Sequence, residues 1–113
     1  MTSREREIIE CIKKKMEETL PADSRGVLFG SRARGEARED SDWDIHILIP
    51  GEEVLSLREM GRYADPIMEL GWEFDQDFSV LVYSHSGWKK RSFLPFYKNL
   101  EEDKIILYDS RRS

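Results

Sequence analysis

Hydrophobic residues recur along the chain in two patterns, one at every third or fourth position and one at every second position. The first pattern predicts two long helices. The first helix opens on Thr2 and Glu5, which form a capping-box pattern, and carries an apolar stripe on one face. That stripe consists of Ile8, Ile9, Ile12, Met16 and Leu20. The second helix covers about residues 53–70, where Pro66 predicts a kink or a restart with Asp65 as the cap.

Short apolar runs and alternating positions predict four strands. They lie at residues 26–30, 42–50, 73–84 and 104–109. The second of these alternates, so Asp42 and Asp44 project from one face together with His46, while Trp43 and three isoleucines occupy the other face. We expect His46 to have a packing or hydrogen-bonding role within the sheet.

These elements, with a short helix near Ser86 and another at about residues 93–102, alternate between helix and strand. That order predicts an α/β (α+β) fold, in which helices pack against one mixed sheet of about four strands. No repeat, linker or low-complexity tract divides the chain, so we expect a single domain over residues 1–113. Its parts are a core segment at 28–49, the third strand at 73–84, and a C-terminal helix and edge strand at 86–109.

Composition mostly excludes functions. The formal net charge of −5 argues against nucleic acid as a partner, because duplex binding needs a broad basic surface. The single cysteine cannot form an internal disulfide, and no apolar run approaches the roughly 20 residues of a membrane span. The first residues also lack the apolar core of a signal peptide. We therefore expect a soluble cytoplasmic protein with no membrane partner.

The candidate chemistry lies in the segment LFGSRARGEAREDSDWDIHILI, residues 28–49. Gly30 and Ser31 fall where the first strand ends, so the backbone there can approach a ligand closely and offer free N–H groups. Arg32 and Arg34 add guanidinium groups that suit phosphate oxygens. This phosphate cradle lacks the spacing and the lysine of a P-loop.

Asp42 and Asp44 supply the complementary chemistry. Two carboxylates on one face of a strand repel each other unless a cation or a proton lies between them. Hard oxygen ligands, completed by water and phosphate, suit Mg²⁺. The segment thus places an anion site beside a divalent cation site.

The run GSRARG at residues 30–35, followed by SDWD at residues 41–44, resembles the motif of the minimal nucleotidyltransferases. These are small members of the DNA polymerase beta-like nucleotidyltransferase superfamily. The resemblance implies that Gly30 and Ser31 hold the phosphates of ATP or another nucleoside triphosphate, and that two aspartates hold one or two Mg²⁺ ions. Those aspartates are Asp42 and Asp44. A hydroxyl would then attack the α-phosphorus, and pyrophosphate would leave.

The family also needs a third carboxylate on a neighbouring strand, where many members carry an aspartate inside an apolar run. Here the equivalent run FSVLV, residues 78–82, carries Ser79 or Val80 at that place. Asp77 is our preferred substitute as catalytic residue and metal ligand, and Asp75 is the second choice.

Two functions follow from the resemblance. The first is Mg²⁺-dependent transfer of a nucleotidyl group, AMP from ATP, to a hydroxyl of a protein or a small molecule. Minimal nucleotidyltransferases are often the antitoxin of a two-gene pair, and some modify a tyrosine of a partner with a helical HEPN domain. Since a chain of this size leaves no room for an acceptor-binding domain, we expect such a partner or a homodimer. The alternative is a nucleotide-binding or partner-masking module with weak or no activity, because it lacks the third carboxylate.

Overall fold

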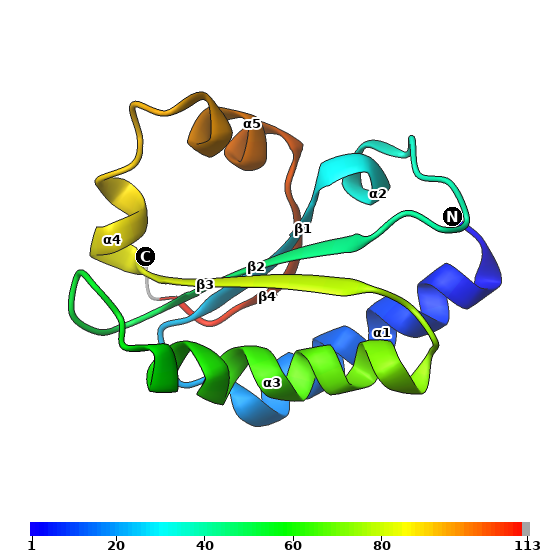
Figure 1. Ribbon diagram of the computed structural model, residues 1–113, viewed down its shortest axis with the longest axis horizontal. Coiled ribbons are helices and arrows are strands. Elements are labelled where there is room, and N and C mark those ends of the chain that lie inside the picture. Colours follow the sequence, from blue (N-terminus) through cyan, green and yellow to red (C-terminus); the bar gives the residue numbers. More distant parts are fainter. Residues whose placement is uncertain (112–113) are drawn as a thin grey trace.

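The computed structural model describes residues 1–111 and shows one sheet with helices on both of its faces (Figure 1). The elements are, in chain order, α1 (Ser3–Thr19), β1 (Arg25–Phe29), α2 (Gly30–Arg34), β2 (Trp43–Ile49), α3 (Leu57–Glu73), β3 (Phe78–Ser84), α4 (His85–Lys89), α5 (Pro95–Asp103) and β4 (Ile105–Asp109). The capping box of Thr2 and Glu5 opens α1 as predicted. The predicted fold class, a small α+β domain, is confirmed.

The sheet is mixed and has four strands, in agreement with the prediction. Its strand order is β3-β2-β1-β4, in which β1 runs antiparallel to both of its neighbours while β2 and β3 are parallel. A parallel pair needs a crossover connection, which α3 provides. β1 therefore ends, and β2 and β3 begin, at the same end of the sheet, on the right in Figure 1.

Apolar side chains on the two faces of the sheet form two separate cores. On one face, Trp43 and the isoleucines of β2 are buried against α1 and α3, as their alternation predicts. On the other face, a smaller core is formed by Val27, Leu48, Trp88 and Leu100. This smaller core lies under α4 and α5 and does not include Asp44, which remains partly accessible at its margin.

The second long helix begins and ends later than predicted. α3 starts after Ser56, whose hydroxyl accepts a hydrogen bond from the backbone N–H of Glu59 in a complete capping box. The helix continues through Pro66 and does not restart at Asp65, because buried side chains before and after the proline pack against the sheet. Within the described residues, no helix combines the length and the apolar composition that crossing a bilayer requires.

The third strand is shorter than the predicted span of residues 73–84. Only Phe78–Ser84 is strand, since α3 occupies the start of that span and Asp75 adopts a left-handed conformation with φ of 54°. The backbone N–H of Gln76 donates to the carbonyl of Gly71 at 2.8 Å, which closes the helix with a turn. Asp75 therefore belongs to this turn and not to a strand.

Candidate active site

Gly30 and Ser31 form the turn where β1 ends and α2 begins. Gly30 has a φ of +75°, and a Cβ atom on it would collide with the carboxylate of Asp44 on β2. Both the left-handed φ and the close approach require glycine. The Gly-Ser turn and the aspartate strand therefore meet directly, at the right-hand end of the sheet in Figure 1.

Asp42 and Asp44 differ in their surroundings although they are close in sequence. Asp44 is half-buried within β2, whereas Asp42 is exposed just before the strand. Burial and the negative charge of Asp42 raise the pKa of Asp44, and the nearby Arg34 lowers it in part. A cation between the two carboxylates would relieve their repulsion.

The neighbouring strand does not bring a carboxylate to the same position. In the parallel register of β2 and β3, Asp44 lies beside Ser79, which is exposed. Asp77 lies just before β3, where its carbonyl accepts a hydrogen bond of 2.8 Å from the backbone N–H of Trp43. Across residues 1–111, no three side chains of His, Cys, Asp or Glu come close enough to hold a metal ion together. The role of Asp77 as the third carboxylate stays a prediction.

Arg32, predicted to bind phosphate, is buried under the loop that joins α2 to β2. Its guanidinium donates to the carbonyl of Ser41 at 2.7 and 3.1 Å, pairs with Glu5 of α1 at 3.2 Å and lies over the ring of Trp43. The structure thus places Arg32 as a support of the loop that leads into β2, while its phosphate contact stays a prediction. No sequence signal identified Ser41 or Glu5 as its partners, because they come from separate segments.

Arg34, the other predicted phosphate ligand, stays at the surface. Its side chain is 42% exposed and pairs with Glu36 at 3.1 Å and with Asp103 of α5 at 3.2 Å. Its charge also reaches Asp44, whose pKa it lowers. Of the two arginines, Arg34 is the one that the structure brings to the surface beside the aspartates.

His46 lies on the same face of β2 as Asp44 but inside the smaller core. It is fully buried, with its ring centroid 4.2 Å from that of Trp88 and 5.3 Å from that of Tyr83. Burial, with the positive charge of Arg25, lowers the pKa of His46 to about 3, so the ring is neutral near pH 7. The expected packing role is confirmed, and His46 takes no part in the accessible site.

The sequence matches a known domain family over most of its length. That family is described as "Nucleotidyltransferase domain", and the match spans residues 6–110. A relative from Methanocaldococcus jannaschii, named "Putative protein adenylyltransferase MJ0141", is 35% identical over 97 residues. The aligned part is 82% of this chain and 94% of the relative.

Two solved structures share the fold at low sequence identity. One, described as "the toxin-antitoxin with AMP-PNP", has a TM-score of 0.65 and 19% identity. The other, a mutant of the toxin-antitoxin MntA-HpeT, has a TM-score of 0.63 and 16% identity. Each likeness covers 91% of this chain and 74% of the other chain. At these identities the likeness is one of fold.

Proposed function

Because this chain belongs to the nucleotidyltransferase domain family, we propose that it transfers AMP from ATP to a hydroxyl group of a second protein. The observation that carries this proposal is the contact between Gly30 and the carboxylate of Asp44, which joins the two halves of the motif. The M. jannaschii relative supports the choice of AMP and of a protein acceptor, since its name specifies protein adenylylation.

The residues of the site suit the Mg²⁺ complex of a nucleoside triphosphate. Gly30 and Ser31 would receive the phosphates on free N–H groups and a hydroxyl, and Arg34 would add positive charge. Asp42 and Asp44 would hold Mg²⁺. The raised pKa of Asp44 supports this fit, because a carboxylate that is half-buried beside a second one is stabilised when a cation binds between them.

The residues of this chain would promote AMP transfer mainly by holding the phosphates and the metal ion in position. When bound, Mg²⁺ would neutralise the triphosphate and polarise the α-phosphate. The acceptor hydroxyl forms a bond to the α-phosphorus, the bond to pyrophosphate breaks, and the hydroxyl proton passes to a carboxylate of the site. Gly30 and Ser31 hold the departing pyrophosphate while this occurs.

Asp77 is the proposed third carboxylate and proton acceptor, with Asp75 as the second choice. The hydrogen bond to Trp43 fixes the backbone of Asp77 beside β2, and its exposed side chain is free to turn toward Asp42. Asp75 lies in the turn that closes α3, two residues farther along the chain from the start of β3 than Asp77.

The acceptor proposed for the site is a tyrosine of a toxin with a helical HEPN domain. The two solved structures described above are toxin-antitoxin complexes, which supports a partner of this kind. The site is also accessible from solvent, because Asp42 is exposed and Asp44 is only half-buried. An open site leaves room for a protein acceptor to supply one wall.

The second candidate function is a module that binds nucleotide or masks a partner without transferring AMP. The observation that favours it is Ser79, which lies beside Asp44 and carries a hydroxyl, not a carboxylate, at one of the two positions where the resemblance implies an aspartate. If Asp77 does not reach the metal, phosphate binding survives while the chemical step becomes slow.

Label transfer separates the two candidates. The protein is incubated with Mg²⁺ and each nucleoside triphosphate labelled at the α-phosphate, alone and with a HEPN-domain protein. We expect label from ATP on the partner protein and matching release of pyrophosphate. The control is the double variant Asp42→Asn, Asp44→Asn. Wild-type transfer no greater than that of the double variant would reject the enzyme, and Mg²⁺-dependent ATP binding without transfer would establish the binding module.

A further inference from the structure

The two edges of the sheet are protected to different degrees. β4, at one edge, has five residues, pairs with β1 through an irregular register between Gly26 and Val27, and ends at the ion pair of Asp109 with Arg111. β3, at the other edge, has seven residues in an unbroken register with β2 and contains no charged residue and no proline. Unprotected edges of this kind are templates for a further strand.

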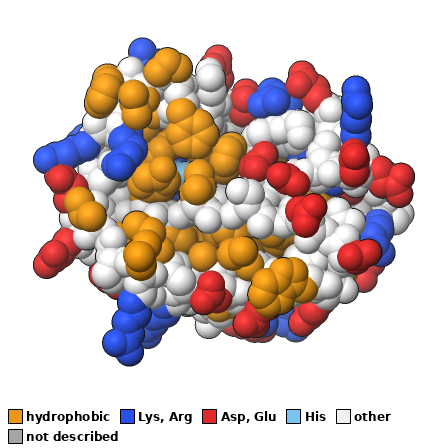
Figure 2. All heavy atoms as spheres, viewed as in Figure 1, with side chains coloured by type: hydrophobic (Ala, Val, Ile, Leu, Met, Phe, Trp, Pro, Cys, Tyr) orange, Lys and Arg blue, Asp and Glu red, His pale blue; other side chains and the backbone are white. Residues whose placement is uncertain are grey.

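Apolar side chains border the exposed edge of β3 on both sides. Figure 2 shows them above and below a pale strip that crosses the middle of this face, where β3 runs in Figure 1. Leu57 and Trp72 of α3 are 85% and 74% exposed, and Phe93, before α5, is 74% exposed. Leu57 and Trp72 lie at the two ends of α3, so exposed apolar side chains are present near both ends of the β3 edge.

A cavity of about 270 Å³ opens at the C-terminal end of the same edge. Its lining includes Val54, Met60, Val82, Tyr83, Lys90 and Arg91. Lys90 pairs with Glu53, and Arg91 lies 5.0 Å from the ring centroid of Tyr83. The lining also contains Glu53, so two basic side chains stand against one acidic side chain, and this end of β3 is apolar with a net positive rim.

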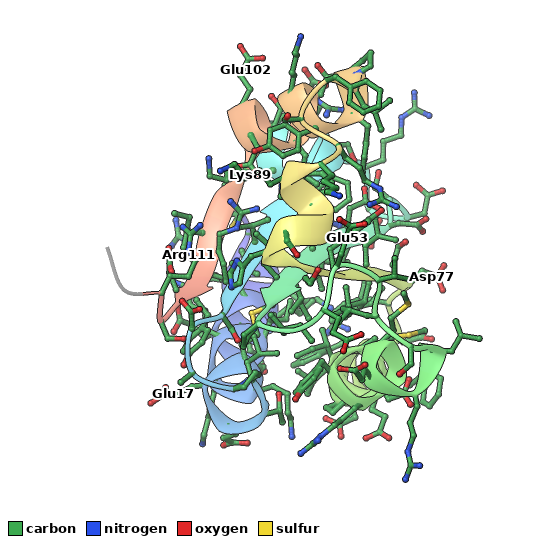
Figure 3. All side chains as sticks on the ribbon, turned by 90° about the vertical axis from the view of Figure 1, so that its left-hand side faces the viewer. Glu17, Glu53, Asp77, Lys89, Glu102 and Arg111 are labelled. Carbon is green, nitrogen blue, oxygen red and sulfur yellow. The ribbon has the colours of Figure 1, made fainter. Side chains whose placement is uncertain are left out.

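The N-terminal end of β3 has the opposite charge. Glu73, Asp75 and Asp77 precede the strand and are exposed, and Trp72 lies beside them. Figure 3 labels Asp77 and Glu53 on the side of the molecule that carries α3, away from Arg111. One edge thus runs from an acidic end with an exposed tryptophan to a basic end with an apolar cavity.

We propose that the edge of β3 binds β3 of a second copy of this chain in an antiparallel arrangement, which makes one continuous eight-stranded sheet. Antiparallel pairing places the acidic end of each β3 beside the basic end of the other. Opposite charges therefore attract at both ends of the strand pair. The pairing also directs Trp72 of each copy toward Leu57 and Val54 at the basic end of the other. A self-complementary patch of this kind is what a two-fold dimer requires. The pairing depends on neither ATP nor transfer activity.

Molecular mass tests the dimer directly. Sedimentation of the wild type gives twice the 13.3 kDa of one chain. Trp72→Lys and Leu57→Glu each weaken the dimer by roughly 10-fold or more, because each replaces an apolar contact with a charge that lies beside like charges of the other copy. The matched control is Ile106→Lys, which changes a 49% exposed residue on the opposite edge and leaves the dimer intact. All three sites are exposed, so each variant chain still folds, which circular dichroism checks.

A cross-link tests the antiparallel register. Leu81 is central in β3, so it faces Leu81 of the second copy across the two-fold axis. In a Cys11→Ser background, Leu81→Cys forms a disulfide-linked dimer on mild oxidation, whereas Ile106→Cys does not. A wild type that sediments as a monomer overturns the proposal, and so does a dimer that cross-links at residue 106 instead of 81. A monomer that binds a HEPN-domain protein and loses it on Trp72→Lys assigns the surface to that partner and also overturns it.

Discussion

β2 and β3 are neighbouring strands that both begin at the candidate site, but they carry different side chains there. β2 carries Asp44, whose carboxylate lies against Gly30 at a point where the backbone tolerates no side chain. β3 carries Ser79 beside Asp44, and its nearest carboxylate, Asp77, lies on the surface just before the strand. The Gly-Ser turn and Asp44 are thus held together by backbone geometry, whereas the third carboxylate depends on one exposed side chain. The two strands should therefore respond differently to substitution.

Removing the charge of Asp44 should have the largest effect. In Asp44→Asn we expect the rate of AMP transfer to fall by roughly 100- to 1,000-fold, the usual loss when a group that stabilises transition-state charge is removed. The rate is measured with labelled ATP in excess Mg²⁺. Asp40→Asn, the same chemical change at an exposed residue of the loop before β2, serves as the control and should transfer at nearly the wild-type rate. Equal rates in Asp44→Asn and the wild type would remove β2 from the mechanism.

The β3 side should show a smaller loss that can be repaired. Asp77→Asn should lower transfer by roughly 10- to 100-fold, as for the loss of a supporting group at a metal site. Adding Ser79→Asp to that variant should restore most of the activity, because residue 79 stands in register with Asp44.

Comparison of Asp77→Asn with Asp75→Asn decides between the two candidate carboxylates. If Asp77→Asn keeps full activity while Asp75→Asn loses it, the third carboxylate is Asp75. If Ser79→Asp fails to repair the loss, the carboxylate acts from a place that residue 79 does not share.

Alanine substitutions at two glycines distinguish the effect of backbone strain from the effect of the contact with Asp44. Gly30 and Gly35 have φ values of 75° and 74°, but only at Gly30 would a Cβ atom meet the carboxylate of Asp44; at Gly35 nothing lies within 4 Å. Gly35→Ala should lose about 1–2 kcal/mol in the free energy of unfolding, the cost of a left-handed residue, and Gly30→Ala should lose more because its Cβ atom also displaces the carboxylate of Asp44. Only Gly30→Ala should also lose Mg²⁺-dependent ATP binding. Equal binding by the two variants would contradict the importance of that contact.

The smallest expected effect is on the pH dependence of stability. Because the pKa of Asp44 is raised in the folded protein, the folded state takes up its proton more readily than the unfolded state. The charged form therefore costs stability above the folded pKa, and this cost disappears as the pH falls through it. At neutral pH without Mg²⁺, Asp44→Asn should be more stable than the wild type by on the order of 0.5 kcal/mol.

Urea unfolding over a pH series checks this difference. The gap between the two proteins should narrow as the pH falls, and Mg²⁺ should stabilise the wild type alone. A gap that widens toward acid pH would mean that folding lowers the pKa of Asp44, which contradicts the unfavourable burial of its charge beside Asp42.

Local signals predicted much of the fold. The capping box at Thr2 and Glu5 fixed the start of α1, and the alternation in β2 assigned Trp43 and Asp44 to opposite faces. The predictions failed where local signals competed. The capping box at Ser56 outweighed the earlier apolar residues and delayed α3, and the turn at Asp75 shortened β3.

The sequence predicted which residues belong to the candidate site, but not which of them come into contact from different strands. The spacing of Gly30 and Asp44 indicated their chemistry, but their contact depends on the antiparallel pairing of β1 with β2. Likewise, the choice between Ser79 and Val80 as the neighbour of Asp44 depends on a strand register that no local pattern encodes. Arg32 could not be assigned for the same reason, since its partners come from distant segments.

Mg²⁺-dependent binding of ATP, measured by calorimetry without any acceptor, tests the unequal contributions of β2 and β3 most directly. Three proteins are compared: the wild type, Asp44→Asn and Ser79→Asp. We predict that the wild type binds ATP more tightly when Mg²⁺ is present, that Asp44→Asn loses this Mg²⁺-dependent gain, and that Ser79→Asp increases it. An affinity that is the same with and without Mg²⁺ in the wild type, or a full Mg²⁺-dependent gain in Asp44→Asn, would contradict the assignment of this site.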